Sequence, residues 1–203
     1  MFKPISNVNS DTVIGRRLIR LLGSDISYYA MHTNFDYAEF GMAHVAAKKL
    51  DLTNVERLDE EQTIIEDGVE KKIGIGRVGD LEESMTLQDF CLKLKKKFAI
   101  SSLAVYANEE DRLKQINRVA ICPGSGKDYI YSAIEKKAQV YVTGDIGHHH
   151  GIDAKGEGII LVDAGHYRLE QIFIEYIEQY LNKQLSANVD ILTAQVKNPF
   201  LII

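Results

Sequence analysis

The chain has 203 residues, a formal net charge of −5 and a hydrophobic fraction of 45%. This length allows one sizeable domain or two small lobes with a buried core, and the acidic balance gives no basic footprint for nucleic acid. No apolar run approaches the ~20 residues that cross a membrane, the first residues lack the apolar core of a signal peptide, and the two cysteines make no disulfide framework. We therefore predict a cytoplasmic protein with no membrane or nucleic-acid partner.

The first eighty residues change repeatedly between helical and strand-like patterns. In chain order they predict a helix at 12–22, a buried strand at 25–32, a loop at 33–37, a helix at 39–50, a hairpin or loops at 56–72 and a glycine-rich strand at 71–79. The hairpin turn is expected at Asp67–Gly68.

The remaining residues continue the alternation. Thr86 is expected to cap a helix whose apolar side chains recur at helical spacing from Leu87 to Phe98. After it the pattern predicts strands at 102–107 and 118–124, a helix at 129–138, strands at 139–145 and 158–165, a long helix from Leu169 to Leu181 and a strand at 190–196. Strands alternating with helices predict an α/β protein.

Three polar stretches could carry chemistry. His166 and Glu170 lie four residues apart, so on a helix their side chains share one face and could grip one metal ion. The alternative is an ordinary surface pair. His148, His149 and His150 follow a predicted strand, where at most one or two of them could reach a site, and the alternative is a polar loop.

The third stretch is His32-Thr-Asn-Phe-Asp36, at the end of a predicted strand. Asp36 could be a carboxylate ligand and His32 a second ligand or a proton carrier. The alternative is a simple turn, for which Asn34 and Asp36 are well suited.

Several of these stretches resemble one family. The motifs are YYAMHTNFD (28–36), GIGRVGDLEESMTLQDF (74–90), VAICPGSGKD (119–128), VTGDIGHHHGIDAKGEGIILVDAGHYRLE (142–170) and NPF (198–200). In order, and over nearly the whole chain, they resemble the Nif-three-like (NGG-one-interacting factor three) dinuclear metal centre family, whose members are often named GTP cyclohydrolase 1 type 2 homologs. Ser84 stands where a proline is usual, and Pro123 where a glycine is usual.

The resemblance implies a fold and a set of site residues. The fold is a single domain over 1–203 with three α/β/α layers and mixed sheets, in two lobes at roughly 1–110 and 111–203 with a metal site in the cleft between them. Two divalent ions, zinc, iron or manganese, would be held by Asp36, His166 and Glu170. His32 and His149 would line the pocket and carry protons.

One departure from the family pattern concerns the remaining ligands. The family supplies two more from a His-His-Pro motif before a segment resembling Phe2-Lys3-Pro4-Ile5, and no His-His-Pro occurs in this sequence. We expect this to weaken a dinuclear site, with His148 or His150 as possible substitutes. A truncated chain, a mis-started gene and a natural short form are the three alternatives.

Two functions are compatible with these patterns. The first is a metal-dependent hydrolase that acts on a nucleotide or cyclic-amide compound. The second is a non-enzymatic metal-binding or metal-handling scaffold that acts through protein partners. The resemblance also implies a homo-oligomer, in the form of a hexameric ring.

Overall fold

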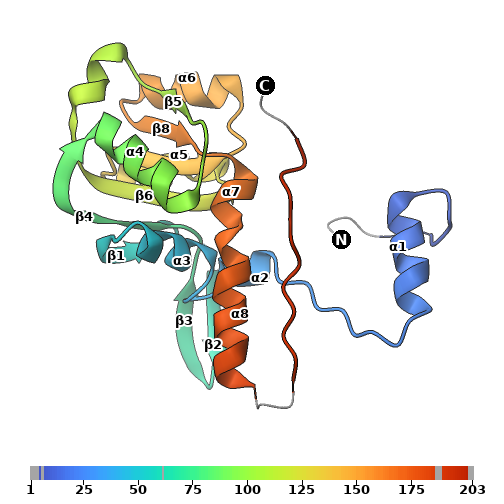
Figure 1. Ribbon diagram of the computed structural model, residues 1–203. Coiled ribbons are helices and arrows are strands. Elements are labelled where there is room, and N and C mark those ends of the chain that lie inside the picture. Colours follow the sequence, from blue (N-terminus) through green and yellow to red (C-terminus); the bar gives the residue numbers. More distant parts are fainter. Residues whose placement is uncertain (1–4, 6, 61, 186–188, 201–203) are drawn as a thin grey trace. The chain divides into compact units, whose positions relative to one another are not determined.

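The computed structural model describes residues 5, 7–60, 62–185 and 189–200 (Figure 1). The chain divides into two compact units, Met1–Asn34 and Phe35–Ile203. The predicted division into lobes near residue 110 stays a prediction. No helix in the described ranges is long and apolar enough to cross a bilayer.

The first unit contains one substantial helix, α1 (Val13–Leu22), which confirms the helix predicted at 12–22. Thr12 caps it, because its hydroxyl accepts a hydrogen bond of 3.0 Å from the Gly15 N–H. The strand predicted at 25–32 is wrong: the segment is exposed and lies in no strand. A strand is stable only when a neighbour pairs with its backbone, and no described strand pairs with this segment.

The second unit is built on a six-stranded sheet with the strand order β1-β4-β6-β7-β8-β5. Its strands are β1 (Thr53–Arg57), β4 (Arg77–Thr86), β5 (Ala104–Tyr106), β6 (Gln115–Ser125), β7 (Val140–Gly144) and β8 (Ile160–Asp163). The central trio β6, β7 and β8 is parallel, and the outer pairs are antiparallel. This mixed sheet confirms the predicted α/β class, although β1 was not predicted.

Helices cover both faces of this sheet. They are α3 (Met42–Lys49), α4 (Leu87–Phe98), α5 (Ile130–Glu135), α6 (His148–Gly156), α7 (His166–Glu170) and α8 (Ile172–Gln184), with short 3-10 turns at Glu109–Leu113 and Lys127–Tyr129. The small helix α2 (Thr33–Asp36) lies where a loop was predicted.

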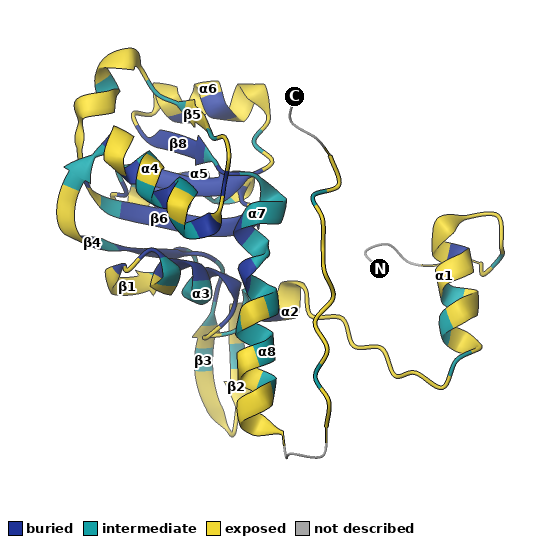
Figure 2. Ribbon diagram, in the orientation of Figure 1, coloured by how far each residue is buried: buried dark blue, intermediate teal, exposed yellow. Residues whose placement is uncertain are grey.

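Strand β7 contributes side chains to two hydrophobic clusters, one on each face of the sheet. Val140 and Val142 belong to the hydrophobic cluster under α3, α4 and α8, whereas Tyr141 belongs to the cluster under α5 and α6. Successive side chains of a strand point to opposite faces, so a strand buried on both faces is apolar throughout. Figure 2 shows the central strands in the colour of buried residues.

Three further strand predictions have different outcomes. The hairpin is confirmed as β2 (Gln62–Glu66) and β3 (Val69–Ile73), joined by Asp67 and Gly68, both of which have positive φ. The strand predicted at 190–196 is wrong, since this segment forms no ladder with any described strand. The strand-like stretch at 71–79 is divided between the end of β3 and the start of β4.

Candidate metal site

The candidate site lies at the carboxyl ends of the three parallel strands. Gly124 lies near the end of β6, Asp145 directly follows β7, and His166 begins α7 three residues after β8. Parallel strands end at the same edge of a sheet, and this edge is where open α/β sheets bind ligands. The topology thus brings together three residues that are 21 or more positions apart in the sequence.

His166 is placed between two carboxylates. Its Nδ1 lies 2.7 Å from Asp145 Oδ2, and its Nε2 lies 3.2 Å from Glu170 Oε2. Glu170 is four residues further along α7, as the predicted one-face geometry requires. His166 and Glu170 therefore converge on a common point, and Asp145 orients the ring from behind.

These carboxylates change the acidity of the imidazole. The hydrogen bond that the ring donates to Glu170 is the largest cause that raises the pKa of His166 to about 9; burial lowers this pKa, and the hydrogen bond that the ring donates to Asp145 raises it further. The ring is thus an imidazolium at neutral pH in the metal-free protein, with both N–H groups donating. A metal ligand must be neutral at the coordinating nitrogen, so metal binding would release the Nε2 proton.

Backbone geometry makes room for this cluster. Gly124 has a φ of +84°, and a Cβ placed on it would lie 2.8 Å from Glu170 Oε1. Asp145 has a φ of 58°, a left-handed conformation that aspartate tolerates better than most residues. A larger residue at position 124 would be strained by the positive φ and would displace the Glu170 carboxylate.

The donor types suit a divalent metal, but the described residues supply only part of a site. A histidine whose second nitrogen donates to a carboxylate is the usual form of a metal-bound imidazole. Within the described ranges, however, no group of three or more His, Cys, Asp or Glu side chains is placed to hold a metal ion. Asp36, half-buried in α2, thus does not complete such a group with His166 and Glu170, and its role stays a prediction.

The other predicted site residues are His32, in the first unit, and His149, in the second. His32 precedes α2. Its backbone N–H donates to Asn34 Oδ1 at 2.7 Å, and its ring Nδ1 lies 2.9 Å from the Thr33 hydroxyl. His149 is exposed in the first turn of α6, with its ring 5.6 Å from that of His148. The proton-carrier roles of His32 and His149 therefore stay predictions.

The polar loop considered as the alternative for His148–His150 does not form, because these residues form the first turn of α6. Gly147 provides the N-cap position, and the buried Gly151 and Ala154 hold the helix against the sheet. The three histidines are therefore exposed at the N-terminal end of a helix. The sequence did not indicate this helix, because its apolar residues do not recur at helical spacing.

A cavity of about 510 Å³ opens beside the cluster. Asp145, His166 and Glu170 line it, together with three residues of the C-terminal segment, Val196, Pro199 and Phe200. The Tyr167 hydroxyl donates a hydrogen bond of 2.7 Å to the Val196 carbonyl and ties this segment to α7.

Asp145, Gly124 and Tyr167 are site residues that the sequence reasoning did not single out. For Asp145 a signal was present, because it is the last residue of the strand predicted at 139–145. Gly124 and Tyr167 matter because each contacts a residue far away in the sequence, Glu170 and Val196 respectively. The spacing of residues in one sequence does not indicate such contacts.

Comparisons with known proteins agree with this fold. Residues 1–199 match the family model described as Duf34/NIF3 (NGG1p interacting factor 3). A Streptococcus pneumoniae protein named GTP cyclohydrolase 1 type 2 homolog is 35% identical over 98% of this chain and 74% of its own length.

Two solved structures are similar to the whole chain. A Bacillus cereus protein related to NIF3 has a TM-score of 0.87 at 22% identity, covering 100% of this chain and 81% of its own. Staphylococcus aureus protein SA1388 has a TM-score of 0.80 at 27% identity, with coverages of 100% and 77%.

Proposed function

The chain belongs to the Duf34/NIF3 (NGG1p interacting factor 3) family, and on that premise we propose that it is a metal-dependent hydrolase whose metal is held by His166 and Glu170. We propose Asp36 as a further ligand and two divalent ions, zinc, iron or manganese, as the full complement. A homo-oligomeric, ring-shaped assembly and a cytoplasmic location are proposed with it.

One observation carries the proposal. Two metal-ligating side chains, His166 and Glu170, meet at 3.2 Å on one helical turn, and a third group, Asp145, holds the opposite nitrogen of the ring. An ordinary surface pair four residues apart would not require a second carboxylate, Asp145, on the other ring nitrogen. It would also not require Gly124, which lets the β6 backbone approach Glu170. This supports a built site over an incidental ion pair.

Each proposed site residue has a separate part in the proposed hydrolysis. Asp145 keeps a proton on Nδ1 of His166, so that, once Nε2 has lost its proton, the Nε2 lone pair is directed toward the side of Glu170. When bound, a divalent ion polarises a substrate oxygen and makes a bound water more acidic. Glu170 and Asp36 would provide hard oxygen donors, and His32 or His149 would carry protons.

The substrate class is proposed from the names of the relatives. Several are called GTP cyclohydrolase 1 type 2 homolog, which points to hydrolysis of a cyclic amide or a nucleotide. The cavity of about 510 Å³ has room for a compound of this size.

The test is the metal content per chain, measured by inductively coupled plasma mass spectrometry after gel filtration. We expect about two zinc, iron or manganese ions per chain, and we expect His166→Ala and Glu170→Ala each to lower the metal affinity by at least about tenfold. His44→Ala and Glu175→Ala change the same residue types elsewhere and should leave the content unaltered. A wild-type content near zero after incubation with each metal would overturn the proposal.

Turnover is tested next on the metal-loaded protein. Hydrolysis of a cyclic-amide or nucleotide substrate should vanish with chelation and in the Glu170→Ala variant. Metal binding with no turnover across such a panel would contradict the hydrolase while leaving the metal site intact.

A further inference from the structure

We propose that the cavity beside His166 and Glu170 binds the uncharged ring of a cyclic-amide substrate and provides no site for a triphosphate. This inference rests on the proposed function, because the reacting group must reach the metal-binding pair. It goes further by assigning which part of a nucleotide-like compound the protein recognises.

The cavity has two chemically different kinds of lining residue. Asp145, His166 and Glu170 are charged or polar, whereas Ile174 and the residues of the C-terminal segment are apolar. Small-molecule sites are mostly apolar with a few converging polar groups. The arrangement suits a planar ring with one reactive polar edge.

The C-terminal segment supplies the surface on which such a ring could lie. Pro199 and Phe200 line the cavity, and the Phe200 side chain is 57% exposed and therefore accessible. The hydrogen bond from the Tyr167 hydroxyl to the Val196 carbonyl holds this segment at the cavity. Aromatic faces bind heterocycles by offset stacking, which needs no charge on the ligand.

The charge of the cavity argues against a triphosphate. Among the described residues that line it there is no lysine or arginine, while Asp145 and Glu170 are carboxylates. One divalent ion would balance these two charges. A second ion, shared with Asp36, would leave one positive charge in excess. A triphosphate brings several negative charges, and sites that bind one normally surround it with cations or backbone N–H groups.

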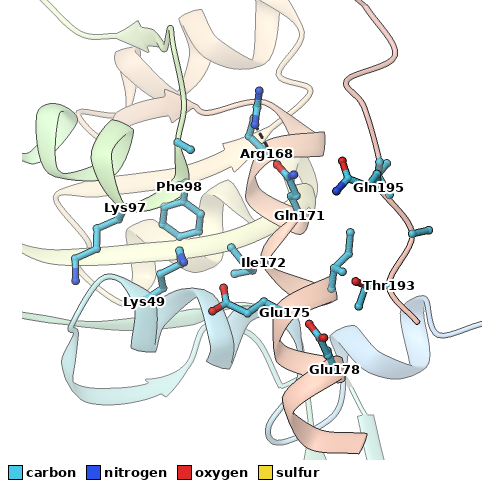
Figure 3. A pocket seen from close by; sticks show the side chains of 14 residues that line it. Lys49, Lys97, Phe98, Arg168, Gln171, Ile172, Glu175, Glu178, Thr193 and Gln195 are labelled. Carbon is cyan, nitrogen blue, oxygen red and sulfur yellow. Dashed lines mark hydrogen bonds between the residues drawn. The ribbon is translucent and has the colours of Figure 1, made fainter. Parts of the chain in front are cut away.

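A second cavity of about 470 Å³ is the obvious alternative site for phosphates. It shares Gln171, Ile174 and Val196 with the first cavity and is lined by Lys49, Lys97 and Arg168. Figure 3 shows the two lysines on the α3 and α4 side and Arg168 on α7.

These cations already have partners or counter-charges. Lys97 Nζ lies 2.8 Å from Asp51 Oδ2, and Arg168 Nη1 donates to Gln171 Oε1 at 3.1 Å. Glu175 and Glu178 line the same cavity (Figure 3). Among the described lining residues these two carboxylates offset two of the three cations, and Asp51 is shared between Lys97 and Lys93, so the second cavity offers at most one surplus positive charge to a phosphate.

The experiment compares guanosine, GMP and GTP, which share one cyclic-amide ring and differ in phosphate number. Binding to the metal-loaded protein is measured by isothermal titration calorimetry at constant ionic strength. We expect GTP to bind no more than about threefold tighter than guanosine. A gain of tenfold or more from guanosine to GTP would overturn the inference.

Variants locate the binding surface. Phe200→Ala and Tyr167→Phe should weaken guanosine at least threefold without lowering the metal content. Tyr180→Phe, at an exposed tyrosine on α8, is the matched control and should change neither. Lys97→Ala should leave the affinity for GTP unchanged, and a loss there would assign the phosphates to the second cavity and contradict the inference.

The two proposals can fail separately. If metal binds but none of the three compounds does, the inference is wrong and the metal site stands. If no metal binds, the proposed function fails, whatever the ligands do.

Discussion

At the scale of single residues, His166 is decisive because both of its ring nitrogens face carboxylates. Asp145 and Glu170 come from different elements, the end of β7 and the last residue of α7, yet each stabilises the protonated ring. The same pair of contacts would serve a neutral, metal-bound imidazole, with the ion in place of the Nε2 proton. Proton and metal therefore compete for one nitrogen.

This competition gives a pH prediction for the metal-free protein. The pKa of His166 is raised from 6.5 to about 9, so its contribution to folding stability is fully present below pH 6.5 and is lost as the pH rises through about 9. Asp145→Asn and Glu170→Gln should each move the titration midpoint of His166 toward 6.5, as followed by histidine ring resonances in NMR. A wild-type midpoint near 6.5 would show that the two carboxylates do not contact the ring in solution.

At the scale of elements, helix α4 shows how local chemistry sets the ends of a helix. Thr86 Oγ1 accepts a hydrogen bond of 3.1 Å from the Asp89 N–H, which satisfies an otherwise unpaired donor of the first turn. At the other end Ala99 adopts a φ of 53°, a left-handed conformation usually taken by glycine. The helix is therefore well capped at its start and strained at its end.

We predict that Ala99→Gly raises the free energy of unfolding by about 1 kcal/mol, because glycine adopts this conformation without steric cost. Urea denaturation followed by circular dichroism measures the change. Ala133→Gly, within helix α5 and buried, should instead lower the free energy by at least about 1 kcal/mol. If Ala99→Gly were as destabilising as the control, the left-handed cap would not persist in solution.

At the scale of the whole molecule, Arg118 of β6 ties strands and a helix together. Its Nη1 lies 2.9 Å from Asp80 Oδ1 on β4, its Nη2 pairs with Glu56 of β1, and its Nε donates at 2.8 Å to the Lys136 carbonyl after α5. Hydrogen bonds from Lys136 and Arg118 hold the pKa of Glu56 below 4.5, and those from Asn54 and Arg118 hold the pKa of Asp80 below 3.8.

These lowered pKa values predict how stability depends on acid. Their contribution is present above pH 4.5 and is lost as the pH falls through the lowered values, because the folded state then has to bind protons that the unfolded state already holds. Arg118→Met should lower the free energy of unfolding by about 1 kcal/mol at pH 7, a modest figure because Glu56 is half exposed.

Urea titrations of both proteins at pH 7 and pH 3 measure this dependence. The difference between wild type and variant should shrink from pH 7 to pH 3, because the pH then falls toward the lowered pKa values of the two carboxylates. A difference that is equal at both pH values would mean that Arg118 stabilises the fold by packing alone.

The sequence by itself determined the elements whose information is local. The spacing of Leu87, Phe90, Leu94 and Phe98 specified α4, and Asp67–Gly68 specified the hairpin turn, because periodicity and turn chemistry act over a few residues. It also indicated the His166–Glu170 pair, since a helix alone places residues four apart on one face.

Tertiary structure decided what depends on distant partners. The segments at 25–32 and 190–196 have strand-like side chains, but a strand also needs a backbone neighbour, and neither has one among the described strands. Asp145 reaches His166 only because β7 and β8 are adjacent and parallel, and Gly124 meets Glu170 only because β6 pairs with the other side of β7. Pairing between strands is set by the competition of whole segments for the core, so the site that it builds cannot be read from local sequence spacing.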